Sequence, residues 1–305
     1  MVVNPRRSRL PLHPAPGEME ASHKTKNPKA RWILIVLFLA AGALVLSVGM
    51  TFAPLIPRDY RVVSQVTVIV CLLALAIASY KNTRLRPHWR LPLAYSAACC
   101  ALVISGYTGD WVVAWAGKTL ETPGGLTALK LGEDATIVGI VIALEFVTRD
   151  NPAELFLSQG RLRLGLVIGV SSFLLLTILG LAVTAAQGVP PDLIRGLLPA
   201  YVSVALADGF MEELFFRGLF LKRIGRLVGD NWANVITAAV FSFAHVQAQF
   251  VNNLPSFLVA VFLLGLLWGW IMQRTRSLLA PSLVHAGVDM LIIADFFTAF
   301  ETSLQ

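Results

Sequence analysis

The residues best suited to chemistry are ionisable side chains that interrupt long apolar segments in the second half of the chain. They are Glu212, Glu213, Arg217, His245, His285 and Asp289. An ionisable group at the centre of a membrane span costs about 2.5–3.5 kcal/mol on insertion scales, and such groups usually face the protein interior or water. Their presence on three separate apolar segments therefore predicts one buried polar site.

The spacing of these residues indicates which side chains lie together. Residues four apart share one face of a helix, so Glu213 and Arg217 are predicted to form an internal ion pair. This pair leaves Glu212 free to point into a cavity. With a rise of about 1.5 Å per residue, Glu212, His245 and Asp289 lie roughly 15–20 Å from the cytoplasmic ends of their spans. Three helices thus bring polar side chains to a similar depth.

A carboxylate and a neutral histidine can together activate a water molecule, because one of them accepts a proton that is later returned to the leaving group. A second histidine can donate a hydrogen bond to a developing oxyanion. This set suits the hydrolysis of an amide bond with no cofactor. It also suits a divalent metal such as zinc, whose ligands would then be Glu212, His245, His285 and Asp289.

Other catalytic motifs of membrane proteases find no support in the sequence. HExxH and GxSxG are absent, and GYTGD at 106–110 departs from the GxGD of intramembrane aspartyl proteases at Tyr107. Two non-enzymatic interpretations stay open. One is a membrane scaffold that binds a partner in the cavity, as in bacteriocin immunity. The other is a proton-linked transporter, although no paired broken helices support it.

The elements that must position these residues are membrane helices. The chain has 305 residues, of which 56% are hydrophobic and only 14% are charged, as expected of a polytopic membrane protein. Runs of about 20 apolar residues predict an all-α fold with eight or nine transmembrane helices. The predicted spans are Trp32–Ile56, Tyr60–Tyr80, Leu91–Tyr107, Ala135–Val147, Leu164–Ala186, Leu193–Leu221, Asn231–Phe250, Pro255–Met272 and Leu278–Phe300.

Basic residues cluster at alternate helix ends, and the positive-inside rule makes these ends and the N-terminus cytoplasmic. The formal charge of +7 therefore reflects membrane topology and not nucleic-acid binding. Residues 1–30 are predicted to be a disordered basic tail, 31–150 the N-terminal transmembrane helices, and 160–305 the domain that carries the chemistry. The stretch Gly109–Glu133 is predicted to be an external loop. Gly265 and Gly269, four residues apart, predict a close contact between two helices.

Three motifs, in this order, resemble those of the CPBP family, the CAAX-protease and bacteriocin-processing family that is also called the Abi family. EELFFR at 212–217 fits EExxxR, FSFAH at 241–245 fits FxxxH, and HAGVD at 285–289 fits HxxxN/D. The resemblance covers roughly residues 160–305, and the family includes the type II CAAX prenyl endopeptidases. It implies a membrane-embedded endopeptidase, either a glutamate protease or a metalloprotease, with an α-helical core and a cavity open to the cytoplasm.

The resemblance also implies a role for each matching residue. Glu212 and His245 would activate water, while His285 and Asp289 would stabilise the oxyanion. The supporting residues would be Glu213, Arg217 and Phe241. One departure matters, because CAAX-type members are expected to have Asn at the last position, and an ionised Asp289 accepts hydrogen bonds but donates none. The implied partners are membrane lipid and a peptide or membrane-protein substrate, and the implied location is a bacterial plasma membrane.

Overall fold

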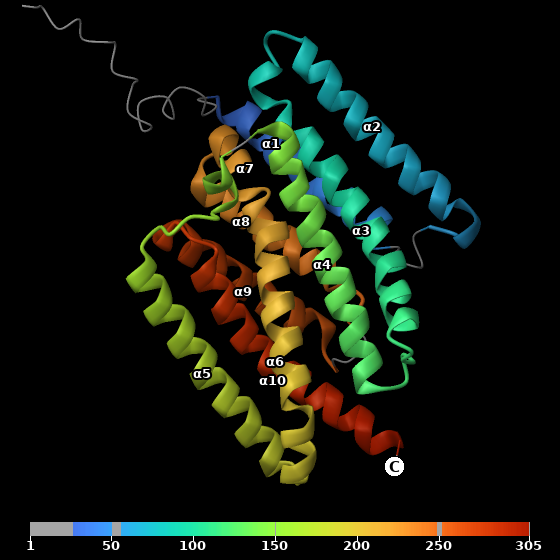
Figure 1. Cartoon of the computed structure of the whole chain (residues 1–305). Helices are drawn as coiled ribbons and strands as arrows, with labels where there is room; N and C mark the ends of the chain where they lie inside the picture. The colour runs from blue at the N-terminus through green and yellow to red at the C-terminus, as the bar shows by residue number, and fades with distance from the viewer. Residues whose placement is uncertain (1–26, 51–55, 150, 249–251, 305) are drawn as a thin grey trace, which may run out of the picture.

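The computed structural model describes residues 27–50, 56–149, 151–248 and 252–304, with the side chains of the last helix described as far as residue 292. Over this part of the chain the fold is a bundle of helices without a β-strand, which confirms the predicted all-α class (Figure 1). The helices are α1 Pro28–Gly49, α2 Arg61–Lys81, α3 Arg90–Trp115, α4 Pro123–Thr148, α5 Leu162–Ala186, α6 Pro191–Glu212, α7 Leu221–Val228, α8 Asp230–Ala244, α9 Leu254–Thr275 and α10 Leu279–Leu304. Residues 1–26 of the predicted tail lie outside the described residues, and residues 28–30 already belong to α1.

The chain is an integral membrane protein, because six helical segments within the described ranges are long and apolar enough to cross a membrane. They are Pro28–Gly49, Arg58–Lys81, Arg86–Trp115, Leu162–Ala186, Pro191–Val228 and Leu254–Thr275. A seventh apolar stretch, Leu279–Ile292 in α10, is shorter. The predicted total of eight or nine spans requires α4, α8 and α10 to cross the membrane as well, and for these three helices it stays a prediction.

The external loop predicted for Gly109–Glu133 is wrong over most of its length. α3 continues to Trp115, and α4 already begins at Pro123. Thr122 explains this start: its hydroxyl oxygen accepts a hydrogen bond from the N–H of Gly125 at 3.0 Å, and proline suits the first turn of a helix. The polar residues of the segment, which we expected to lie in water, therefore belong to a helix that packs against α3 and α6.

The helices that carry the candidate residues occupy the middle of the bundle. α6 packs against both α4 and α10, and α8 packs against α9 and α1. α2 and α5 lie on opposite flanks of the bundle (Figure 1), and only 17% and 11% of their most apolar windows are buried. These two helices therefore form outer walls suited to lipid, whereas α4, α6, α8, α9 and α10 surround the polar residues.

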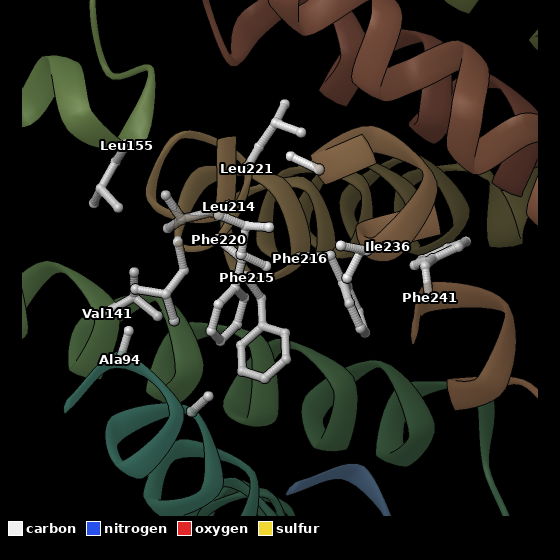
Figure 2. Packing of buried hydrophobic residues seen from close by; sticks show 14 of the residues in the cluster. Ala94, Val141, Leu155, Leu214, Phe215, Phe216, Phe220, Leu221, Ile236 and Phe241 are labelled. Carbon is white, nitrogen blue, oxygen red and sulfur yellow. The ribbon is translucent and has the colours of Figure 1, made fainter. Parts of the chain in front are cut away.

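Aromatic side chains fill the core beside the polar residues. Figure 2 shows Phe215 and Phe216, which follow α6, among buried side chains of neighbouring helices. The ring of Phe216 meets that of Phe241 in α8 edge-on, with centroids 5.0 Å apart. This contact joins the end of α6 to α8, so the packing of the core fixes the position of the FSFAH motif relative to EELFFR.

Glycines set the close contact between α8 and α9 that their spacing predicts. A Cβ atom on Gly265 would lie 3.2 Å from the Cβ of Ala238 and 2.8 Å from Nη2 of Arg217. A Cβ atom on Gly269 would lie only 1.9 Å from the side-chain oxygen of Asn234. Neither position has room for a larger residue, so the predicted tight packing at this pair is confirmed.

A third glycine brings α6 against α10 and gives a test of the packing. A Cβ atom on Gly209 would lie 2.8 Å from the amide nitrogen of Ala286 and from the carbonyl oxygen of Ser282, both backbone atoms that cannot rotate away. We therefore expect Gly209→Ala to destabilise the protein by about 1–3 kcal/mol, the range for overpacking. Thermal unfolding of the detergent-solubilised protein measures this.

Gly196→Ala is the matched control, because it lies on the same helix and a Cβ atom there would meet nothing within 4 Å. Alanine favours an exposed helix by about 0.5–1 kcal/mol over glycine, so this variant should be as stable as the wild type or more so. Equal losses for the two variants would contradict the close α6–α10 contact.

Candidate active site

The backbone that carries the motif EELFFR leaves the regular α-helical pattern. Glu212 ends α6, and Glu213–Gly218 form a π-helical stretch. At the end of this stretch, the N–H of Leu219 donates to the carbonyl oxygen of Leu214, five residues earlier, at 2.9 Å. Single π-helical turns inside α-helices are frequent at functional sites, because they insert one extra residue and re-aim the side chains that follow. Here the π-helical stretch begins at the second of the two glutamates.

Arg217 and Glu213 form the ion pair that their spacing predicts. Arg217 Nη1 lies 2.6 Å from Glu213 Oε1, and both side chains are completely buried. The guanidinium group also lies over the ring of Phe241 at 4.4 Å and is 5.5 Å from the ring centroid of Trp268. A buried guanidinium needs this surrounding of opposite charge and aromatic faces, so α6, α8 and α9 are held together at one point.

His285 of α10 lies among three carboxylates. Its Nδ1 is 3.1 Å from Glu213 Oε1, and its Nε2 is 3.3 Å from Glu212 Oε2. Asp289 Oδ1 lies 3.6 Å from the same Nε2. Ionised carboxylates only accept hydrogen bonds, so a ring with N–H groups on both nitrogens matches these neighbours best. The site therefore holds a histidine that is arranged to donate.

Trp268 fixes the plane of the His285 ring and was not found by sequence reasoning. The two rings stack with centroids 3.7 Å apart and an interplanar angle of 15°. The ring of Phe241 packs edge-on against that of His285, with centroids 5.6 Å apart and an interplanar angle of 82°. The sequence did contain a signal for Trp268, because it lies between Gly265 and Gly269. An aromatic residue next to these glycines is close to the tight contact between α8 and α9.

The two adjacent glutamates differ in access to solvent. The side chain of Glu212 is 22% exposed, whereas that of Glu213 is completely buried and already bonded to Arg217. A water molecule or a substrate can thus reach Glu212 but not Glu213. This difference agrees with the expectation that Glu212 is the glutamate that points away from the ion pair.

His245 lies just beyond the last turn of α8, half-buried beside Phe241. Its Nδ1 lies 2.9 Å from the Phe241 carbonyl oxygen, and the two rings are 4.7 Å apart. A carbonyl oxygen only accepts, so Nδ1 donates this hydrogen bond, and Nε2 is the ring nitrogen not engaged by this carbonyl group. Among the described contacts no hydrogen bond or ion pair joins His245 to Glu212. The structure therefore brings Glu212 and His285 into contact and places His245 next to Phe241, which also touches His285.

The expected metal ligands do not form a recognisable metal site. Within the described ranges, no three or more His, Cys, Asp or Glu side chains are grouped so that they could hold a metal ion. His245 in particular uses one ring nitrogen for the Phe241 carbonyl group, and among the described residues it forms no hydrogen bond or ion pair with Glu212, His285 or Asp289. The donor set of Glu212, His245, His285 and Asp289 thus does not fit a resident metal in this structure.

A fourth helix, α4, adds charged groups that sequence reasoning missed. Lys130 Nζ lies 2.9 Å from Oδ1 of Asp208 on α6, and Asp134 beside it is only 2% exposed. Lys130, Glu133 and Asp134 are spaced to share one helix face, which was the available signal. The wrong loop prediction for Gly109–Glu133 hid it, because it left Lys130 outside the membrane.

Comparison with protein families gives a match over part of the chain. Residues 194–291 match the family described as type II CAAX prenyl endopeptidase Rce1-like. The matched range begins in α6, ends in α10, and contains the π-helical stretch and all three motifs. No curated protein and no solved structure matches the chain. The match confirms the resemblance drawn from the EELFFR, FSFAH and HAGVD motifs.

Loss of one partner of the buried ion pair is expected to destabilise the protein strongly. Arg217→Met leaves Glu213 charged and buried, and an uncompensated buried charge costs about 3–5 kcal/mol. The double variant Glu213→Leu with Arg217→Met removes both charges and should recover much of this loss. Thermal unfolding in detergent measures both. If Arg217→Met unfolds at the same temperature as the wild type, the ion pair does not hold the site together.

Proposed function

Since residues 194–291 carry a domain of the Rce1-like family of type II CAAX prenyl endopeptidases, we propose that the chain is an intramembrane endopeptidase. It hydrolyses a peptide bond near the cytoplasmic side of the membrane. The observation that supports this most directly is the 3.3 Å contact between Glu212 Oε2 and His285 Nε2, next to a completely buried ion pair. A solvent-accessible carboxylate beside a hydrogen-bond donor is the minimum needed to activate water and to stabilise an oxyanion.

Glu212 acts as the general base. It accepts a proton from a water molecule whose oxygen attacks the carbonyl carbon of the peptide bond. His245, which directly follows α8, assists: its Nδ1 donates to the Phe241 carbonyl oxygen, so Nε2 is the nitrogen that accepts a proton when the ring is neutral. The attack converts the carbonyl oxygen into an oxyanion and needs no group that this chain lacks.

His285 donates a hydrogen bond to that oxyanion, and Asp289 assists when it carries a proton. Glu212 then transfers its proton to the leaving nitrogen, the carbon–nitrogen bond breaks, and a carboxyl terminus and an amine are released. Glu213 and Arg217 support the site, since Glu213 accepts from His285 Nδ1 at 3.1 Å while it neutralises Arg217. Phe241 supports it through its contacts with both histidine rings.

The proposal extends to the surroundings of the enzyme. The N-terminus lies in the cytoplasm, the host membrane is a bacterial plasma membrane, and residues 160–305 form the protease domain behind the helices of 31–150. The substrate is a lipidated C-terminal tail, a small precursor peptide or a membrane-anchored regulator. Support for this comes from the family match and from the apolar helices that surround the site.

Glu212→Gln tests the proposal, because glutamine keeps the shape of the side chain but cannot accept the proton of water. We expect a loss of proteolysis of about 10²–10⁴-fold, the range for a general base. Comparison of peptide termini in membranes with the wild-type protein and with Glu212→Gln would reveal the substrate as the termini that disappear. The variant protein should stay folded, because Glu212 is not part of the Glu213–Arg217 ion pair.

A non-catalytic scaffold predicts the opposite outcome. If the set of termini is the same in both membranes and the variant is present at equal abundance, the endopeptidase proposal is wrong. His245→Ala serves as a second variant, since it removes a proton acceptor from a different helix and should reduce the same termini.

Asp289 gives an independent prediction about the oxyanion. Asp289→Asn supplies an amide N–H donor of the same size, so it should retain or raise cleavage of the termini that Glu212→Gln abolishes. Asp289→Leu removes every donor and should lower cleavage by about 10²-fold, at the low end of the effect of one oxyanion donor. Equal loss in both variants would show that the carboxylate charge, and not donation, is what residue 289 provides.

A further inference from the structure

Four arginines gather where the segment before α5 meets the turn between α9 and α10. Arg161 and Arg163 lie at the start of α5, and Arg274 and Arg276 lie at the end of α9. All four are exposed, and among the described residues none of them forms an ion pair with an acidic side chain. These four residues, the arginine cluster, take no part in the mechanism above.

Hydrogen bonds hold the two segments of the arginine cluster together. The N–H of Arg161 donates to the carbonyl oxygen of Thr275 at 2.7 Å, and the hydroxyl group of Ser158 donates to the carbonyl oxygen of Arg276 at 2.8 Å. A Cβ atom on Gly160 would lie 2.3 Å from the Thr275 carbonyl oxygen, so glycine permits this close approach. The two segments are thus fixed side by side before any ligand binds, which lowers the entropic cost of binding.

Two acidic residues near the arginine cluster do not neutralise it. Glu154, from the segment before α5, is already paired with Arg226 of α7 at 2.6 Å. The backbone of Asp230 lies near the end of α9, since its carbonyl oxygen accepts a hydrogen bond from the side chain of Gln273 at 2.9 Å. Within the described ranges, however, no ion pair joins the carboxylate of Asp230 to the arginine cluster. The four positive charges therefore call for an anion from outside the chain.

Arg276 occupies a backbone position that glycine would fill more easily. Its φ is 55°, in the left-handed region, where it ends α9. Helices commonly end with glycine in this conformation, because a Cβ atom is unfavourable there. Residues that persist in such regions are frequent at functional sites. The conformation of the turn thus favours glycine, and an arginine there calls for a use of its side chain.

The protein surface next to the arginine cluster is apolar and exposed. α5 lies on the flank of the bundle (Figure 1), and its residues Leu164 and Val167 are 41% and 68% exposed. Trp270, one turn before Arg274, is 49% exposed, and the guanidinium carbon of Arg274 lies 5.5 Å from its ring centroid. Exposed tryptophans of membrane proteins are enriched at the level of the lipid headgroups. The arginine cluster therefore lies at headgroup depth, beside apolar walls that suit acyl chains.

We propose that the arginine cluster binds the headgroup phosphate of an anionic phospholipid, whose acyl chains lie along α5 and α9. Guanidinium groups suit phosphate, because they donate two parallel hydrogen bonds to it. A zwitterionic lipid brings its own positive charge and leaves the cluster uncompensated, so an anionic lipid is the better partner. A free phosphate ion would use the arginines but not the apolar walls. The inference does not depend on the proposed endopeptidase function.

Thermal unfolding of the purified full-length protein in an uncharged detergent tests the lipid site. Phosphatidylglycerol added to the micelles should raise the unfolding temperature by about 3 °C or more. Phosphatidylcholine with the same acyl chains should raise it much less. High salt should reduce the difference, because exposed charges are screened. Equal stabilisation by the two lipids would overturn the proposal, since it would mean that the acyl chains alone bind.

A double variant, Arg161→Gln with Arg276→Gly, tests the arginine cluster itself. Glycine suits the φ of 55°, so this variant should stay folded without lipid, and it should lose most of the stabilisation by phosphatidylglycerol. The matched control is Lys81→Gln with Arg84→Gln, which removes two exposed positive charges at the end of α2 and should respond to lipid as the wild type does. Equal losses in both double variants would mean that diffuse surface charge attracts the lipid, and the proposed site is then wrong.

Inorganic phosphate distinguishes a lipid from a soluble anion. Sodium phosphate without lipid should leave the unfolding temperature of the wild-type protein as it is in sodium chloride of equal ionic strength. If phosphate alone stabilises the protein as phosphatidylglycerol does, the arginine cluster is a site for a soluble anion and the lipid proposal fails. Should the first double variant not fold, Arg163→Gln with Arg274→Gln takes its place, because it leaves the hydrogen bonds between the two segments untouched. An unchanged response to phosphatidylglycerol in that variant would equally overturn the proposal.

Discussion

A guanidinium group without access to water must be surrounded by compensating groups, and this requirement at Arg217 organises the site. Arg217 is completely buried, so Glu213 must supply a negative charge, while Phe241 and Trp268 supply aromatic faces. Gly265 leaves the space that the guanidinium occupies. The same residues then hold His285, since Glu213 accepts from its ring and Trp268 stacks on it. Charge neutralisation and orientation of the histidine are thus one arrangement, contributed by α6, α8, α9 and α10.

Adjacent residues of the same type receive different environments in this arrangement. Glu213 is completely buried in the core, whereas the side chain of Glu212 is partly exposed. An α-helix separates neighbouring side chains by about 100°, and the helix packs closely enough for that angle to decide which glutamate meets Arg217. The two carboxylates of the EE dipeptide therefore have different surroundings, a sealed ion pair for Glu213 and a partly exposed contact with His285 for Glu212, with no difference in their covalent structure.

Sequence reasoning predicted most of what depends on local spacing. The all-α class, the Glu213–Arg217 pair and the close contact at Gly265 and Gly269 follow from apolar runs and from residues four apart, and the structure contains all of them. What it missed depends on contacts between distant segments. The stretch Gly109–Glu133 is too polar to predict as a membrane helix from its own composition, and the ionic partner of Lys130 in the bundle, Asp208, lies some eighty residues later. The stacking of Trp268 on His285 likewise needs the three-dimensional fold.

The extra residue of the π-helical stretch has a mechanical consequence for the far end of the bundle. One added residue turns everything after it by about 100° compared with an uninterrupted α-helix. α7 therefore starts in a shifted rotational phase, and in that phase Arg223 reaches the buried carboxylate of Glu145 on α4. Deleting one residue from the stretch would rotate Arg223 away from Glu145 and break the ion pair between α7 and α4. The π-helical stretch that follows Glu212 thereby also helps to link α7, in the second half of the chain, to α4 in the first half.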